Sequence, residues 1–283
     1  MYDPVYTRAF YNMYAEAEWL RLEKTAFGRL KAIIHNDFIK RYIRPGDRVL
    51  DAGSGPGRFS ITITENGGKV TVLDISDHQL TLAKQKLTEA KVLGCVEQFI
   101  EADIVDLSMF STGHFDSVVC YGGALSYVCE KRYEAATELI RVTRPGGFIL
   151  VSVMSLLGGL LTIITQQRDL SALRSPEDTM SFRPGLWEVL DTGNLLSFPS
   201  KSVESQHAPM HLYTAEELQN LFKDCDVLEV AGSNVTTSEF SNALEEISAD
   251  SHAWSTLIEL ERKLNSNPGL VNSGNHIILV ARR

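Results

Sequence analysis

The sequence predicts an α/β fold built on a doubly wound, largely parallel sheet. Between residues 48 and 153, short apolar runs rich in β-branched residues alternate with helical segments. A glycine-rich turn at 53–57 joins the first run to the first of these helices. An acidic residue ends or follows each of the first three runs. Since the carboxyl ends of parallel strands share one edge, these features predict a ligand crevice at that edge.

The core elements follow in chain order. Apolar runs predict strands at 48–51, 69–74, 96–101, 115–121 and 148–153. Between them, helices are expected at 57–65, at 77–91 and at 130–143. Ser76 and Asp77 are suitable caps for the second of these helices. The segment Pro145-Gly146-Gly147 predicts a turn before the fifth strand.

The flanking segments predict two caps and a completed sheet. Residues 2–43 have helical periodicity, whereas 154–212 contain a short apolar helix at 156–167 and no clear strand. Thr214 begins a further helix, and a helix is also expected at 239–264. Late strands at 226–230 and 276–281 could form an antiparallel edge. We therefore expect four parts: an N-terminal helical cap (1–45), an α/β core (46–153), a cap insertion (154–212) and a C-terminal completion of the sheet (213–283).

Composition limits the possible partners. The 283 residues suit one large domain or one core with an attached cap, and the net charge of −9 argues against a general nucleic-acid binder. The four cysteines form no Cys-x-x-Cys pair, so we expect reduced thiols and no metal site. The N-terminus has no apolar signal segment, and the longest apolar stretch, 156–164, is far shorter than the ~20 residues of a membrane span. These features predict a cytoplasmic protein without a membrane partner.

The glycine-rich turn departs from the dinucleotide pattern Gly-x-Gly-x-x-Gly. Gly53, Gly55 and Gly57 alternate, and Arg58 holds the position of the third glycine. Asp51, at the end of the first strand, would repel a pyrophosphate. A carboxylate here favours a cationic ligand without phosphate. S-adenosylmethionine (SAM) has that character, since it carries a sulfonium, an ammonium and an adenosine.

Three acids are expected along one side of the crevice. Asp51, Asp74 and Asp103 follow the first three strands. Asp74 is suitably placed to hold both ribose hydroxyls. Asp103 could accept from the adenine amine while Ile104 packs on the ring. Each acid alone could instead be an ordinary turn or cap residue.

Residues 48–153 resemble the class I SAM-dependent methyltransferases. Residues 51–57 have the family's form Asp/Glu-x-Gly-x-Gly-x-Gly, while 115–119 and 144–147 match later motifs. The segments 11–22 and 216–230 extend the resemblance to small-molecule members. The resemblance implies a Rossmann-like, seven-stranded mixed sheet of order 3-2-1-4-5-7-6. It also implies cofactor contacts from Asp51, Gly53, Gly55, Asp74, Ile75, Asp103, Ile104 and Tyr121.

The N-terminal helix could cover the cofactor with Tyr11, Trp19 and Arg21. Arg21 could pair with the methionine carboxylate, or it could lie on a solvated helix face. After the fourth strand, Tyr121 and Tyr127 flank two glycines on the route from cofactor to acceptor. The family motif Asn/Asp-Pro-Pro-Tyr/Phe is missing there, which counts against methylation of DNA or RNA bases.

Candidate general bases are His207 and His211, which lie where the cap returns to the core. Either could instead be a surface or hydrogen-bonded histidine. Cap residues with apolar side chains could bury the acceptor or simply pack a core: Met180, Phe182, Trp187 and Phe198. The prediction is a methyltransferase that converts SAM to S-adenosylhomocysteine and methylates a small molecule by in-line displacement. The alternatives are an NAD(P)-dependent oxidoreductase and a SAM-binding protein without methyl transfer.

Overall fold

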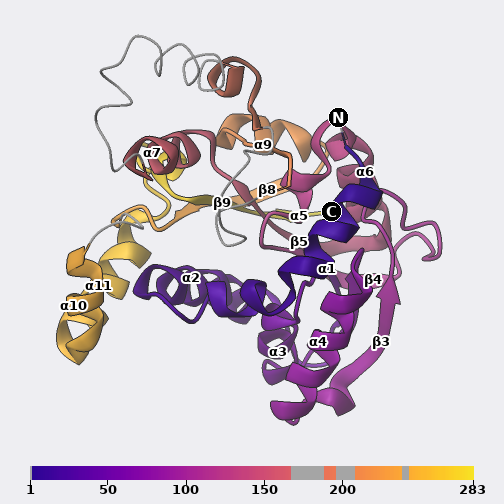
Figure 1. Ribbon diagram of the computed structural model, residues 1–283. Helices are drawn as coiled ribbons and strands as arrows, with labels where there is room; N and C mark the ends of the chain where they lie inside the picture. The colour runs from indigo at the N-terminus through magenta and orange to yellow at the C-terminus, as the bar shows by residue number, and fades with distance from the viewer. Residues whose placement is uncertain (1, 167–187, 196–207, 238–241) are drawn as a thin grey trace.

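The computed structural model describes residues 2–166, 188–195, 208–237 and 242–283. A seven-stranded sheet of order β3-β2-β1-β4-β5-β9-β8 forms its centre, which confirms the predicted strand order (Figure 1). The strands of this sheet are β1 (Arg48–Ala52), β2 (Lys69–Asp74), β3 (Val96–Glu101), β4 (Phe115–Cys120), β5 (Thr143–Met154), β8 (Asp226–Ser233) and β9 (His276–Arg282).

The first five strands are parallel, β8 runs in the same direction, and β9 alone of the seven strands is reversed. β9 pairs antiparallel with both β5 and β8. This confirms the expected antiparallel edge. Residues 276–281 of β9 are all buried, because the strand lies between two others and helices cover its faces. The doubly wound mixed sheet is therefore the predicted fold class.

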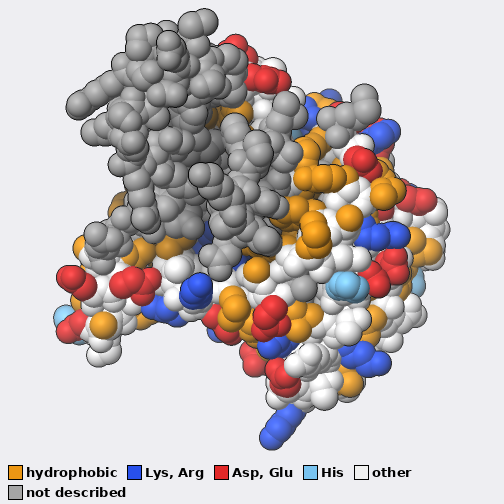
Figure 2. Space-filling model, viewed as in Figure 1, with side chains coloured by type: hydrophobic (Ala, Val, Ile, Leu, Met, Phe, Trp, Pro, Cys, Tyr) orange, Lys and Arg blue, Asp and Glu red, His pale blue; other side chains and the backbone are white. Residues whose placement is uncertain are grey.

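Helices cover both faces of the sheet. One apolar layer combines strand residues with α2 (Ala26–Tyr42), α3 (Arg58–Glu65) and α4 (Asp77–Glu89). The opposite layer includes α6 (Arg132–Val142) and α9 (Ala215–Leu221). The first helix, α1 (Pro4–Arg21), packs against α4 near the carboxyl ends of the strands. Val5 and Met13 of α1 are exposed. Figure 2 shows hydrophobic side chains on the surface in the region where α1 lies in Figure 1.

The predicted N-terminal helix is two helices. Thr25 caps α2 by accepting from the backbone N–H of Gly28 at 3.0 Å. A side chain at Gly28 would place its Cβ only 2.2 Å from the carbonyl oxygen of Arg21. Glycine therefore allows the start of α2 to turn sharply against the end of α1. Because the helix is interrupted between α1 and α2, α1 runs across the edge of the sheet and not along it.

Two other predicted boundaries were wrong. Pro145–Gly147 is not a separate turn but lies within the bounds of β5, where the pairing with β4 is irregular between Thr143 and Phe148. The late helix is divided into α10 (Asn242–Ala249) and α11 (Ser251–Leu264). Asp250 caps α11 by accepting from two backbone N–H groups, which begins a new helix inside the periodic pattern.

The described part of 154–212 has an apolar cluster of its own. It contains α7 (Leu156–Gln166) and the short pair β6 (Asn194–Leu195) and β7 (Met210–His211). The cluster consists of Leu156, Val189, Leu195, Met210 and Leu212 and contacts Tyr127. The four cap residues named above, Met180, Phe182, Trp187 and Phe198, lie outside the described residues. Among the described helices, none has the length and apolar character needed to cross a membrane.

Candidate functional site

A cavity lies at the carboxyl ends of β1, β2, β3 and β4, beneath α1. The space within its walls, part of it open to solvent, is about 810 Å³. Nine of the ten predicted cofactor contacts line this cavity: Tyr11, Arg21, Gly53, Gly55, Asp74, Ile75, Asp103, Ile104 and Tyr121. They come from α1 and from four different strand ends, so tertiary folding brings them together.

The glycine-rich turn forms one wall. Gly53 and Gly55 have φ angles of +73° and +53°, which side chains other than glycine rarely tolerate. A Cβ at Gly53 would lie 2.4 Å from the Cβ of Ala124, in α5 (Ala124–Tyr127). The turn is thus held close to α5, and its backbone faces the cavity.

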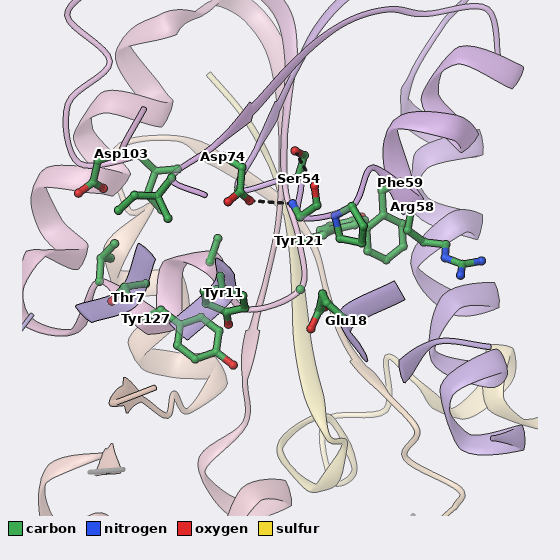
Figure 3. Close-up of a pocket in the computed structure, with 18 of the residues that line it drawn as sticks. Thr7, Tyr11, Glu18, Ser54, Arg58, Phe59, Asp74, Asp103, Tyr121 and Tyr127 are labelled. Atoms are coloured by element: carbon green, nitrogen blue, oxygen red, sulfur yellow. Dashed lines mark hydrogen bonds between the residues drawn. The ribbon is translucent and has the colours of Figure 1, made fainter. Parts of the chain in front are cut away.

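Asp74 anchors this turn from the end of β2. Its Oδ2 accepts from the N–H of Gly55 at 2.8 Å, the bond dashed in Figure 3, and its Oδ1 accepts from the N–H of Ser76 at 2.9 Å. The pKa of Asp74 is raised to about 6, mainly by burial and to a lesser extent by nearby Glu18, against the opposing effect of the two backbone bonds. A cation or hydrogen-bond donor in the cavity would stabilise the ionised form of this carboxyl group.

Asp103 lies at the end of the cavity beyond Asp74 (Figure 3). Its Oδ1 accepts from the N–H of Val105 at 3.0 Å, and its Oδ2 accepts from the hydroxyl of Tyr2 at 2.7 Å. The backbone N–H of Tyr2 donates to both carboxylate oxygens of Glu130, at 2.8 and 2.9 Å. Hydrogen bonds from Tyr2 therefore hold the N-terminal segment at this end of the cavity.

Asp51 departs from the expectation for the three acids. It does not line the cavity, because strand alternation places its side chain on the same face of β1 as Val49, toward α3. Its Oδ2 accepts from the hydroxyl of Ser60 at 2.5 Å. Burial raises the pKa of Asp51 to about 7, the bond from Ser60 opposes this, and Asp74 adds to it. Asp51 thus supports α3 behind the turn.

The wall opposite Asp74 comes from α1 and α5. Arg21 contacts Glu18 through two nitrogens, with 2.5 Å between Arg21 Nη2 and Glu18 Oε1. The rings of Tyr11 and Tyr127 meet nearly at right angles, 5.4 Å apart, and their hydroxyls are hydrogen-bonded. Figure 3 shows Tyr11, Tyr127 and Glu18 across the cavity from Asp74. This wall carries both charges of an ion pair and two phenols.

Trp19 does not line the cavity, contrary to its predicted role as a cover. Its ring lies against the guanidinium of Arg58, 3.7 Å from the ring centroid, and against Lys86 at 4.8 Å. Arg58 also donates to the carbonyl oxygen of Trp19 at 3.1 Å. Trp19 therefore holds the end of α1 against α3 and α4.

Comparison with known proteins supports the resemblance. Residues 49–147 match the family model described as a methyltransferase domain. This part of the chain is therefore similar to the class I SAM-dependent methyltransferases, and the sheet has the strand order expected of them. The resemblance predicted from the glycine-rich turn and the strand-end acids is thereby confirmed.

Relatives of this chain include malonyl-[acyl-carrier protein] O-methyltransferase from Erwinia billingiae, 38% identical over 60% of this chain and 57% of the relative. A ubiquinone/menaquinone biosynthesis C-methyltransferase from Ectopseudomonas mendocina is 38% identical over 38% of this chain and 42% of that protein. The chain thus spans about half the length of these relatives. The solved structure of magnesium protoporphyrin IX methyltransferase from Synechocystis PCC 6803 has the same fold, with a TM-score of 0.60, 16% identity and 99% coverage of both chains.

Behind the cavity, Tyr121 packs into a buried aromatic cluster. Its ring lies 5.2 Å from Phe59 and 4.9 Å from His35, and its hydroxyl has no partner among the described residues. The Nδ1 of His35 donates to the carbonyl oxygen of Lys31 at 2.8 Å. Burial lowers the pKa of His35 to about 3, so its ring is neutral at physiological pH.

His211 is not placed to act as the expected base. It does not line the cavity, and both of its ring nitrogens are engaged, Nε2 with Glu217 at 2.7 Å and Nδ1 with Asn194 at 2.9 Å. It joins the cap to α9. His207, the other candidate base, lies outside the described residues.

Among the cavity residues that the sequence analysis did not assign to the site, three on the N-terminal segment carry polar side chains: Tyr2, Thr7 and Glu18. Glu18 and Arg21 stand one helical turn apart, a spacing that brings side chains into contact. That spacing was a usable signal for the ion pair. Tyr2 and Thr7 carried no signal, because only the docking of α1 on the sheet brings them to the cavity.

Proposed function

We propose that this protein is an enzyme that transfers the methyl group of SAM to a small-molecule acceptor by in-line displacement. The observation that carries the proposal is the arrangement of charges around the cavity. Asp74 and Asp103 lie at adjacent strand ends, and Glu18, the ion-pair partner of Arg21, lies across from Asp74 (Figure 3). The match of residues 49–147 to a methyltransferase domain supports the same cofactor.

Each part of SAM has a matching group in the cavity. Asp74 is suited to the ribose hydroxyls, and Asp103 to the adenine amine, with Ile104 against the ring. Glu18 and Arg21 carry the charges complementary to the ammonium and carboxylate of the methionine part. A Cβ on Gly55 would lie 3.7 Å from the Cγ of Glu18, so this pair stands directly over the glycine-rich turn.

The same residues disfavour a nicotinamide dinucleotide. A pyrophosphate needs free backbone N–H groups or a cation near the turn. Here the N–H of Gly55 is bonded to Asp74, and Arg58 is engaged by Trp19 and by Glu23 at 2.8 Å. Two phosphate charges would therefore face carboxylates.

Methyl transfer requires mainly orientation from the protein. The sulfonium is an activated leaving group, so the cofactor supplies the difficult part of the chemistry. Residues of this chain would fix the cofactor, exclude water and align the acceptor, which can contribute several kcal/mol. The two parts of the molecule suited to close over the acceptor are α1 and the segment 154–212.

Isothermal titration calorimetry tests the cofactor, with SAM, S-adenosylhomocysteine, NAD and NADP as ligands. We expect one-to-one binding of the first two and none of the others. Transfer of labelled methyl to a panel of small carboxylates, amines, phenols and quinols then tests the reaction. Binding of NAD or NADP without SAM would support the oxidoreductase, and SAM binding without any transfer would support the non-catalytic alternative.

A further inference from the structure

Tyr11 and Tyr127, the two phenols on the cavity wall, have one hydroxyl proton available for a hydrogen bond to a ligand. Tyr11 and Tyr127 both line the cavity, and burial raises the pKa of each above its usual value, so both stay protonated. Two phenols joined by one hydrogen bond use only one of their two hydroxyl protons, so one proton remains for a ligand. Tyr127 also packs against the apolar cluster of the segment 154–212.

Arg21 adds positive charge beside this pair. Its charge lowers the pKa of both phenols, although the effect of burial is larger. A Cβ on Gly122, just after β4, would lie 4.0 Å from Arg21 Nη2. The guanidinium therefore lies between the phenols and the end of β4. Together these groups form a surface of hydrogen-bond donors and positive charge.

A general base is missing from the described lining of the cavity. The described residues of its wall include no histidine and no lysine. Their acids are Glu18, held by Arg21, and Asp74 and Asp103, each bonded through both oxygens. An ammonium, a phenol or a carbon acid must lose a proton to accept a methyl group. A carboxylic acid, with an ordinary pKa near ~4, is already ionised at neutral pH.

We propose that the acceptor is a carboxylate, which the enzyme converts to a methyl ester, and that Tyr127, oriented by Tyr11, positions it. This inference rests on the proposed function. A lone pair of one carboxylate oxygen forms the new bond to the methyl carbon while the carbon–sulfur bond breaks and its electron pair goes to sulfur. The products are the methyl ester and S-adenosylhomocysteine, and no proton moves. Tyr127 donates to the oxygen that is not methylated.

The first test compares candidate acceptors that have the same carbon skeleton but different reacting groups. Benzoate, octanoate and a malonyl thioester are incubated with labelled SAM beside the corresponding amides, amines and alcohols. We expect label only in the carboxylates, released as methanol by mild alkali, as methyl esters are. Base-stable label on an amine, phenol or carbon would overturn this inference while leaving the proposed function intact. SAM binding without label on any carboxylate would also overturn it, whereas failure to bind SAM would overturn the proposed function itself.

The second test isolates the role of Tyr127. Tyr127→Phe should raise KM for the carboxylate about tenfold, because a hydrogen bond to a charged group is lost, while SAM affinity measured by calorimetry stays unchanged. Tyr133→Phe, at an exposed tyrosine, is the matched control. At saturating SAM, kcat should be flat between pH 7 and 9. A tenfold rise per pH unit in that range would show that a base or the acceptor must be deprotonated, and would contradict the assignment.

Discussion

Glu18 and Arg21 form an ion pair one helical turn apart on α1, with 2.5 Å between Oε1 and Nη2. Both side chains are largely buried, and both line the cavity beneath the helix. An ion pair inside a binding site is expensive to leave unmatched, so it suits a ligand that presents the two opposite charges itself. The amino-acid end of SAM is such a zwitterion. On this account α1 is part of the cofactor site.

Removing one charge of this pair should weaken SAM binding. We expect Glu18→Gln to raise the Kd for SAM about tenfold or more, because Arg21 then lies buried without its partner and the ammonium loses its carboxylate. The control is Glu16→Gln on the same helix, whose side chain is 55% exposed. Calorimetry measures both. Equal affinities for the two variants would remove Glu18 from the site.

Asp74 should contribute about 1–3 kcal/mol to SAM binding, since buried ligand hydroxyls would be left unpaired without it. Asp74→Ala measures this loss, and Asp224→Asn, at an exposed acid far along the chain, is the control. The Kd for SAM is the readout, with thermal unfolding to confirm that the variant is folded. An unchanged Kd would place the ribose elsewhere.

SAM affinity should depend on pH through Asp74. The pKa of this carboxyl is about 6 because of burial, and a cationic ligand binds its ionised form. Below pH 6 the proton must leave before binding, so affinity should fall by up to about tenfold per pH unit, with a plateau above pH 7. Calorimetry at pH 5, 6 and 8 measures this. The same slope in Asp74→Asn would assign it to another group.

His35 should make the fold sensitive to acid. Its pKa is lowered by burial from 6.5 to about 3, so between these values the unfolded chain binds a proton that the folded chain does not. Stability is therefore lost as pH falls through 6.5, by about 2 kcal/mol at pH 5. Urea unfolding at pH 8 and pH 5 should show a smaller difference in His35→Phe than in the wild type. The exposed His252→Phe is the control, and an unchanged difference in the His35 variant would contradict the assignment.

His211 should matter for stability and not for catalysis. His211→Ala would remove the hydrogen bonds that Glu217 and Asn194 make with the ring, at a cost of about 1–3 kcal/mol. Chemical unfolding measures this loss. Under conditions where the variant is folded, kcat should stay within about twofold of the wild-type value. A large loss of kcat with normal stability would restore His211 as a catalytic candidate.

Local sequence patterns were enough to predict the sheet and the position of most strand-end residues. Alternating apolar runs defined the strands, and the acids after β2 and β3 reached the cavity because parallel strands end along one edge. Asp51 did not, because side-chain direction alternates along β1 and the spacing within the motif does not state which face is used. The order of the strands was therefore predictable from the sequence, whereas the face of the strand to which each side chain points was less so.

The contribution of α1 depended on tertiary packing. Its cavity residues reach the site because Arg58 and Lys86 hold Trp19, and because Tyr2 is fastened to Asp103 and Glu130. These contacts join residues far apart in the chain, which no local periodicity encodes. For the same reason, local sequence patterns did not indicate that both ring nitrogens of His211 are hydrogen-bonded: its partners, Asn194 and Glu217, come from different elements.

A crystal structure of the protein soaked with S-adenosylhomocysteine tests the central claim most directly. The account predicts the ribose hydroxyls on the carboxylate of Asp74, the adenine amine at Asp103, and the amino-acid end between Glu18 and Arg21. Density for the nucleoside at any other place, or a cavity left empty at saturating ligand, would contradict it.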